Sequence, residues 1–189
     1  MGGVDGVRLV SVPHPDREEE RAMARNVRLM HCTPDDVFRV LANGWLYPLW
    51  VVGTSRMRDV DESWPAEGAT LHHSFGSWPA VIDDTTVMRE WDPPRRAVLE
   101  PHGGPIGVAR VAIDVKARGD RCVVRIQEEP VTGPTRLLPD TVFDAITRYR
   151  NAETLHRLAY LAEGGAPGTT GGSSALGHES TAEKEPIDR

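Results

Sequence analysis

The sequence predicts an α+β domain in which helices pack on one side of a curved antiparallel sheet. Six strand-like segments follow one another between residues 51 and 129 and are separated by short turn-forming breaks. Strands that are joined by short turns pair antiparallel. A long helical segment, from about Asp140 to Glu163, is the one large element that can cover a face of such a sheet.

The domain is expected to begin with one strand and two short helices. NVRLMHC, residues 26–32, has the mixed alternation of a strand. TPDD, residues 33–36, supplies a Thr cap, a Pro for the first turn and two acids near the positive end of the helix dipole. Asn-Gly at 43–44 ends this helix, and the aromatic segment WLYPLW, residues 45–50, follows it.

The second part of the domain is expected to be six strands and the final helix. The breaks between the strands are rich in Gly, Pro and Asp, which favour turns. Gly119-Asp120, between two alternating segments, predicts a hairpin. The expected strands are VVGTSRMRDV (51–60), ATLHHSF (69–75), TTVMREW (85–91), AVLEP (97–101), GVARVAIDVKA (107–117) and RCVVRIQEE (121–129).

The composition places the folded domain at residues 25–163. Residues 164–189 are rich in Gly, Ser, Thr and charge and have almost no apolar area to bury, so we expect a disordered tail. Residues 1–24, which include the charge cluster DREEER, are expected to form a flexible N-terminal arm. The 39% hydrophobic content of the 189-residue chain is low partly because of the tail.

The net charge of −6 argues against a general nucleic-acid-binding protein, which needs a basic field to bind phosphates. The sequence contains no apolar run of 18 residues and no secretory signal, so we expect a cytoplasmic protein without a membrane span.

Motifs for metals, cofactors and nucleophilic catalysis are absent from the sequence. His72 and His73 are adjacent in a predicted strand, so their side chains point to opposite faces and do not form a metal site together. No HExxH, CxxC or GxSxG pattern occurs. Gly103-Gly104 lacks the spacing and the helix of a phosphate-binding loop. We therefore predict no metal and no cofactor.

Four segments occur in an order that resembles the START/Bet v 1-like (SRPBCC) superfamily, and within it bacterial proteins of the polyketide cyclase/dehydrase type. The segments are TPDDVFRVLANGWLYPLW, GATLHHSF, REWDPPRRAVLEP and RNAETLHRLAYLAEG. The resemblance covers about residues 25–163. It implies a helix-grip fold, in which a seven-stranded antiparallel sheet wraps around a long C-terminal helix. It also implies a cavity for a lipid, polyketide or other apolar ligand, but not a particular reaction.

The final helix supplies the first candidate ligand-binding residues. Small residues alternate with larger ones along one broad face, as at the border of a cavity. Tyr149, His156 and Tyr160 on this face are candidates for hydrogen bonds to a ligand, and Val142 and Ile146 for apolar contacts. The alternative for the polar side chains is a contact with water or backbone. Glu153 is expected to pair with Arg150 or Arg157 instead.

The strands supply the second group of candidates. If Leu71, His73 and Phe75 face the cavity, His73 is an interior polar group. Ile126 and Glu128 share the apolar face of the last strand, which carries Glu128 to the rim or interior of the cavity. A desolvated, unpaired carboxylate there serves as an acid or base. The alternative is a rim carboxylate paired with an arginine such as Arg110 or Arg136. Because the family's short helices gate the cavity mouth, the resemblance suggests Trp45 and Trp50 as pocket walls.

Cys32 and Cys122 provide a test of the expected topology. In a helix grip the first strand pairs with the last, so the two cysteines are expected to be near neighbours and reduced.

Three functions are compatible with these observations. The first is the binding of a small apolar molecule, with Tyr149, His156, His73 or Glu128 orienting it. The second is an aromatase/cyclase or dehydratase that uses the same cavity for general acid/base catalysis, with Tyr149, His156 and Glu128 as catalytic candidates. The third is a non-catalytic interaction protein, with a homodimer formed through a sheet edge or the helical mouth.

Overall fold

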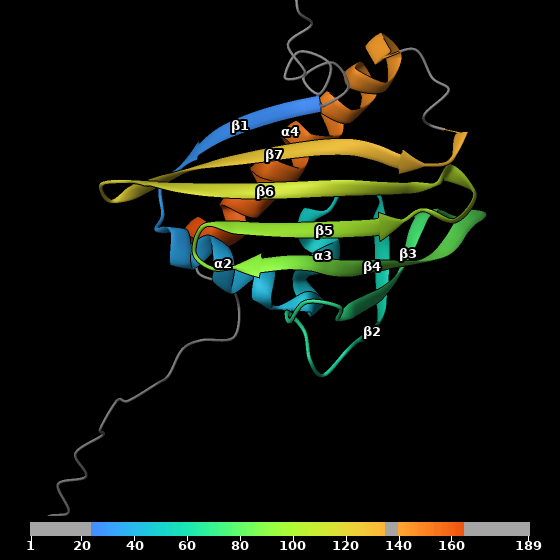
Figure 1. Ribbon diagram of the computed structural model, residues 1–189, viewed down its shortest axis with the longest axis horizontal. Coiled ribbons are helices and arrows are strands. Elements are labelled where there is room, and N and C mark those ends of the chain that lie inside the picture. The colour runs from blue at the N-terminus through green and yellow to red at the C-terminus, as the bar shows by residue number, and fades with distance from the viewer. Residues whose placement is uncertain (1–23, 135–139, 165–189) are drawn as a thin grey trace, which may run out of the picture.

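The computed structural model describes residues 24–134 and 140–164. The expected N-terminal arm and C-terminal tail lie outside the described residues, apart from Ala24 and Gly164. The elements, labelled in Figure 1, are β1 (Ala24–Met30), α2 (Pro34–Ala42), η2 (Gly44–Leu46), α3 (Tyr47–Trp50), β2 (Thr54–Val60), β3 (Thr70–Ser77), β4 (Ala80–Asp92), β5 (Arg96–His102), η3 (Gly104–Ile106), β6 (Val108–Arg118), β7 (Arg121–Thr132) and α4 (Asp140–Gly164).

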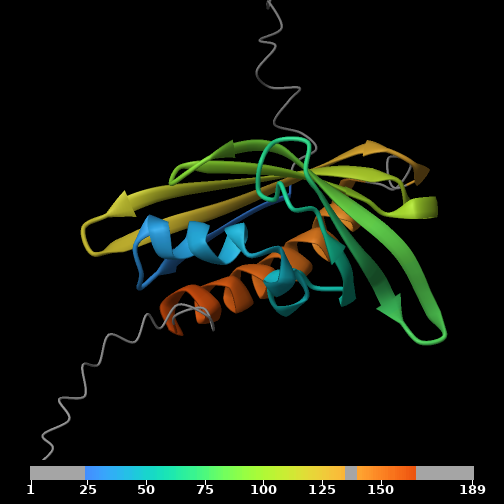
Figure 2. The ribbon, with the colours of Figure 1, turned by 90° about the horizontal axis from the view of Figure 1, so that it is seen from below.

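The seven strands form one antiparallel sheet in the order β1-β7-β6-β5-β4-β3-β2. The sheet curves, and α4 lies along its concave side together with α2 and α3 (Figure 2). The predicted α+β class, the seven strands and the two short helices after the first strand are therefore confirmed. The arrangement places one end of α4 against the core and the other beside a cavity.

Some strand boundaries differ from those expected from the sequence. β4 begins at Ala80 rather than at residue 85, so much of the expected break GSWPAVIDD is strand. The hairpin from β3 to β4 is correspondingly tight, since Ser77 pairs with Ala80. β2 begins at Thr54 rather than at residue 51, because Tyr47–Trp50 forms a helical turn that a short turn connects to β2. Long-range pairing decides these boundaries and overrides the local turn signals.

Helix α2 begins and ends where its sequence indicates. The backbone N–H of Asp36 donates to the Thr33 hydroxyl, and the Asp36 carboxylate accepts from the Thr33 backbone N–H, which makes a capping box. Val37, Phe38 and Val40 form its buried side. The helix therefore packs its apolar stripe against α4 and the sheet.

The hydrophobic core lies between the sheet and the C-terminal half of α4. Leu155 and Leu158 of α4 are fully buried, together with Met30, Leu71 and Ile113 from the strands. Burial of apolar side chains of this size is the main stabilising contribution to such a domain. The N-terminal half of α4 borders the cavity instead of this core.

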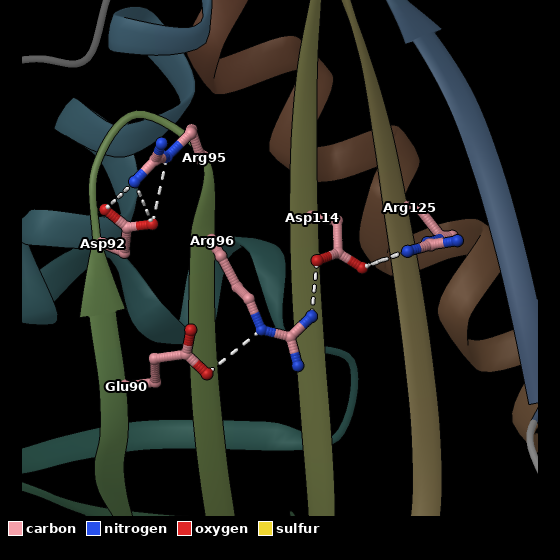
Figure 3. Close-up of polar contacts among 6 residues, drawn as sticks. All are labelled: Glu90, Asp92, Arg95, Arg96, Asp114 and Arg125. Carbon is pink, nitrogen blue, oxygen red and sulfur yellow. Dashed lines mark hydrogen bonds and ion pairs between the residues drawn. The ribbon is translucent and has the colours of Figure 1, made fainter.

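The outer face of the sheet carries a ladder of charges across four strands (Figure 3). Arg96 on β5 contacts Glu90 on β4 at 3.1 Å and Asp114 on β6 at 2.5 Å, and Arg125 on β7 contacts Asp114 at 2.8 Å. Burial alone would raise the pKa of Asp114, but hydrogen bonds from Arg125 and Arg96 outweigh it and lower this pKa. The solvated face thus carries paired charges, while the opposite face is largely apolar.

The two cysteines are neighbours, as predicted. Met30 pairs with Cys122 in the β1–β7 ladder, and the Sγ atoms of Cys32 and Cys122 are 4.0 Å apart. Both are free thiols in the core. Burial is the main reason that the pKa of Cys32 is raised to about 12, and it also raises the pKa of Cys122.

Candidate functional site

A cavity of about 250 Å³ lies between the sheet, α3 and the N-terminal half of α4. Strands β2 to β7 all contribute to its lining, because the sheet curves around it. Most of the walls are apolar and aromatic, as is typical of ligand pockets. The lining includes the large apolar side chains of Trp50, Phe75, Leu99, Val111, Ile126 and Ile146.

A hydrogen-bonded chain of three side chains lies at one wall of the cavity. The hydroxyl oxygens of Tyr47 and Thr86 are 2.9 Å apart, and His73 Nε2 lies 2.9 Å from the same Thr86 oxygen. The rings of Tyr47 and His73 are adjacent, with centroids 5.0 Å apart. Burial, followed by the charges of Arg58 and His72, lowers the pKa of His73 to about 4. The imidazole is therefore neutral at pH 7.

Asp84 on β4 is a second polar group in the lining, and only 6% of it is exposed. Its Oδ1 accepts a hydrogen bond of 2.8 Å from the backbone N–H of Thr85. Burial raises the pKa of Asp84 to about 6, although the Thr85 N–H and the charges of His102 and Arg58 oppose the shift. A carboxyl group with this pKa takes up and releases a proton near neutral pH.

Glu128 on β7 and Arg150 on α4 form an ion pair across the cavity. Glu128 is 4% exposed, whereas the Arg150 side chain is about one-third exposed. Arg150 is therefore the solvent-facing member of the pair. Asn151, the next residue on α4, also lines the cavity and is buried. The pairing with Arg150 compensates the burial of the Glu128 carboxylate.

Tyr47 on α3 adds a buried phenol to the polar groups of the lining. Burial raises the pKa of Tyr47 to about 12, and the hydrogen bond with Thr86 opposes this shift. The charges of Asp84 and Glu128 also raise this pKa, and the charge of Arg150 lowers it. We call Tyr47, His73, Asp84, Glu128, Arg150 and Asn151 the polar end of the cavity.

Solved structures of other proteins share this architecture at low sequence identity. A protein from Chromobacterium violaceum matches with a TM-score of 0.58 and 16% identity over 75% of this chain and 98% of its own. Ara h 8.0201 matches with a TM-score of 0.58 and 10% identity over 75% of this chain and 97% of its own. The di-domain ARO/CYC StfQ from the steffimycin biosynthetic pathway matches with a TM-score of 0.57 and 14% identity over 79% of this chain and 54% of its own.

This chain has the Bet v 1-like helix-grip fold. The match to Ara h 8.0201 and the seven-stranded sheet around α4 agree on this point, and they confirm the fold that the sequence resemblance implied. At these identities the likeness establishes the fold alone. No protein-family model and no curated protein matches the chain.

The helix-grip cavity contains six of the residues that the sequence singled out. Trp50, His73 and Phe75 line it from α3 and β3, and Ile126 and Glu128 line it from β7. Ile146 lies at the rim, where 63% of it is exposed. The partner of Glu128 is Arg150 rather than Arg110, which instead lies 3.4 Å from Glu129. Arg136 and the side chain of Val142 are outside the described residues.

The expected orientation of four other candidates is wrong. Tyr149 is 82% exposed, Tyr160 is 77% exposed and His156 is also exposed, so all three face away from the helix-grip cavity. Trp45 is 58% exposed and lies outside the lining. The buried face of α4 is the one opposite to Tyr149, His156 and Tyr160. Large aromatic rings on α4 suggested an inner surface, but a phenol or indole also sits stably at a water-exposed surface.

The inner face of α4 consists of residues that the sequence analysis did not select. Thr147, Asn151 and Thr154 are buried along the cavity, at the helical spacing of four and three residues. The same face continues into the buried Leu155 and Leu158. These two leucines were the signal in the sequence that could have identified the inner face of α4. Glu153, on the outer side, pairs with Arg157 at 2.7 Å, as expected.

Tyr47 and Asp84 were also missed. Tyr47 lies within the aromatic segment WLYPLW, where only the tryptophans were selected. Asp84 lies in the stretch GSWPAVIDD, for which the sequence predicts a turn, and acids in turns are normally solvated. Only the pairing of β4 with β3 turns Asp84 toward the cavity.

Neither a metal-binding cluster nor a membrane-spanning helix occurs in the part of the chain that the structure describes. Residues 24–134 and 140–164 contain no group of three or more His, Cys, Asp or Glu side chains placed to hold a metal ion. Among the same residues, no helix has the length and apolarity needed to cross a membrane.

Proposed function

We propose that this protein binds a small, mainly apolar molecule in its helix-grip cavity. The observation that carries the proposal is the cavity of about 250 Å³ with largely apolar and aromatic walls. A dry cavity of about 150 Å³ holds one benzene ring, so a space of this size suits a molecule of about two rings. Burial of its apolar surface contributes about 25 cal/mol per Å² to binding.

The polar end of the cavity orients the ligand in this proposal. Glu128, Asn151 and the chain Tyr47–Thr86–His73 offer hydrogen bonds in an otherwise largely apolar space. A few polar groups in an apolar pocket determine the orientation of a ligand, while the apolar walls supply most of the affinity.

Acid/base catalysis in the same cavity is the second candidate function. It is favoured by Asp84, whose pKa is raised to about 6 by burial, beside a neutral His73 with a pKa of about 4. Groups that exchange protons near neutral pH suit a cyclisation or dehydration of a bound substrate. The fold match to the ARO/CYC protein StfQ is compatible with this candidate.

The interaction hypothesis and the homodimer stay predictions from the sequence. Trp45 and Leu49 on the η2–α3 segment are exposed and form an apolar surface that a partner would cover. The ligand-binding hypothesis is stronger than the interaction hypothesis, because it rests on a formed cavity.

Naphthalene provides a test of the binding function. Ala109 on β6 lines the cavity, and Ala117 near the end of the same strand is exposed. In an NMR titration, naphthalene should shift the amide signals of cavity residues. Ala109→Phe fills part of the space and should weaken binding by about tenfold or more, whereas Ala117→Phe should leave it unchanged. Shifts that avoid the cavity, or equal affinity in both variants, would contradict the proposal.

A further inference from the structure

Buried polar atoms without a partner concentrate at the cavity. Seven buried side-chain atoms have no hydrogen-bond partner among the described residues, and four of them belong to residues that line the cavity. Three of these four residues, His73, Glu128 and Asn151, are each less than 5% exposed. Buried polar groups in proteins are normally hydrogen-bonded. The concentration therefore indicates that a bound molecule supplies the missing partners.

Glu128 requires a hydrogen-bond donor. Its Oε1 accepts from Arg150, whereas its Oε2 has no partner. An ionised carboxylate only accepts hydrogen bonds, and a hydroxyl group is the matching donor. An O–H group that donates to a charged oxygen makes one of the stronger hydrogen bonds found in proteins.

Asn151 and the Tyr47–Thr86–His73 chain can donate hydrogen bonds to the ligand. The acceptor is the oxygen of the same hydroxyl group or a second oxygen atom. Asn151 Nδ2 is a free donor. Because a hydroxyl both donates and accepts, the hydrogen bonds of this chain can point from Tyr47 to His73 or from His73 to Tyr47. His73 Nδ1, which has no partner, is accordingly a donor in one direction and an acceptor in the other.

The charges around the cavity disfavour an anionic ligand. Arg150 is the one cationic side chain among the described lining residues, and it is already paired with Glu128. Asp84 adds a second carboxyl group. Arg58, which lies outside the lining, donates to the backbone carbonyls of His73 and Asp84. A ligand carboxylate would therefore meet two acidic groups and no unpaired cation.

We propose that the ligand is an uncharged hydroxylated molecule of about two rings, whose hydroxyl group donates to Glu128, and that the cavity rejects the corresponding carboxylate. The inference rests on the binding function proposed above and specifies the chemical class of the ligand.

Three probes on one scaffold test this specificity: naphthalene, 2-naphthol and 2-naphthoate, titrated by NMR at pH 7. The wild-type protein should bind 2-naphthol roughly tenfold more tightly than naphthalene, because a hydrogen bond to a charged group is gained. It should bind 2-naphthoate more weakly than naphthalene, because the carboxylate adds negative charge beside Glu128 and Asp84.

Glu128→Gln tests the role assigned to the carboxylate. The change leaves Arg150 without its anion, so the preference should reverse and 2-naphthoate should become the better ligand of the two substituted probes. A merely structural loss would weaken all three probes alike. Glu129→Gln is the matched control, because Glu129 is the neighbouring residue on β7 and also faces an arginine, Arg110. This control should keep the wild-type order.

The outcomes separate the two proposals. If naphthalene and 2-naphthol bind equally, or 2-naphthoate binds best to the wild-type protein, the ligand class is overturned and the binding function stands. If none of the three probes binds, the binding function falls and the ligand class falls with it. If Glu128→Gln does not fold, the wild-type order of the three probes still decides the question.

Discussion

At the scale of single residues, the cavity keeps ionisable groups in environments that change their proton affinity. Asp84 and His73 are both buried in its wall, and burial favours the neutral form of each. For Asp84 this raises the pKa, and for His73 it lowers the pKa. The site thus holds a protonatable carboxyl group and a neutral imidazole close to Tyr47, at a cost in stability that apolar residues would not impose.

Asp84→Asn should increase stability in a pH-dependent way. The carboxyl has an ordinary pKa of 3.8 and a folded pKa of about 6. Between these values the folded protein retains a proton that the unfolded chain releases, so wild-type stability falls as the pH rises through this window. Well above pH 6 the variant should unfold with a free energy larger by about 3 kcal/mol. Below the ordinary pKa the difference should vanish. Urea denaturation at several pH values measures it, and a pH-independent difference would refute this account.

At the scale of elements, α4 has two inner surfaces along its length. Its C-terminal half packs Leu155 and Leu158 into the core, and its N-terminal half presents Thr147 and Asn151 to the cavity. A helix that borders a cavity carries small and polar residues on its inner face, while Tyr149 and other large side chains occupy its outer face. The helix therefore lacks one continuous apolar stripe, the usual signal for the buried face of a helix.

Leu158→Ala and Tyr160→Ala test the orientation of α4. Leu158 is completely buried, so its truncation should lower the free energy of unfolding by about 2–5 kcal/mol through lost contacts and a cavity. Tyr160 is 77% exposed, and its truncation should cost less than about 0.5 kcal/mol. Chemical denaturation of both variants provides the comparison. A larger loss for Tyr160→Ala would mean that the inner face of α4 had been assigned to the wrong side.

At the scale of the whole molecule, the pairing of the first strand with the last makes β1 an edge strand of the sheet, in contact with α4. β1 and β7 are distant in the sequence but adjacent in the sheet (Figure 1), and Cys32 and Cys122 meet where they end and begin. Side-chain contacts attach α4 to this edge. Asn26 on β1 donates to the backbone carbonyl of Arg148, and the backbone N–H of His31 donates to Glu163. Separating β1 from the rest of the domain would therefore break contacts along α4, at Arg148 and at Glu163.

The two thiols should report the opening of the whole domain. Both are buried and their pKa values are raised, so neither is a reactive thiolate in the folded protein. Iodoacetamide should leave both unmodified under native conditions and modify both together in urea, as followed by mass spectrometry. Rapid native alkylation of either thiol would show that the β1–β7 edge opens locally, without global unfolding.

The sequence by itself determined the order of the elements, because the signals for them are local. The TPDD cap of α2, the Gly119-Asp120 turn and the alternation of β6 and β7 each act within a few residues. The proximity of the two cysteines followed from the resemblance to a known topology. His73, Phe75 and Ile126 were found because strand alternation indicated the inner side, and Trp50 because the resemblance implied short helices at the cavity mouth.

Only the tertiary structure decided which polar groups meet at the cavity. Tyr47 and Thr86 are 39 residues apart in the sequence, and Glu128 and Arg150 are 22 apart, so no local pattern pairs them. The same holds for the orientation of α4, since its cavity-facing Thr and Asn residues resemble a solvent-exposed surface in the sequence. The curvature of the sheet creates the space that these residues border, and curvature arises from the packing of all the strands.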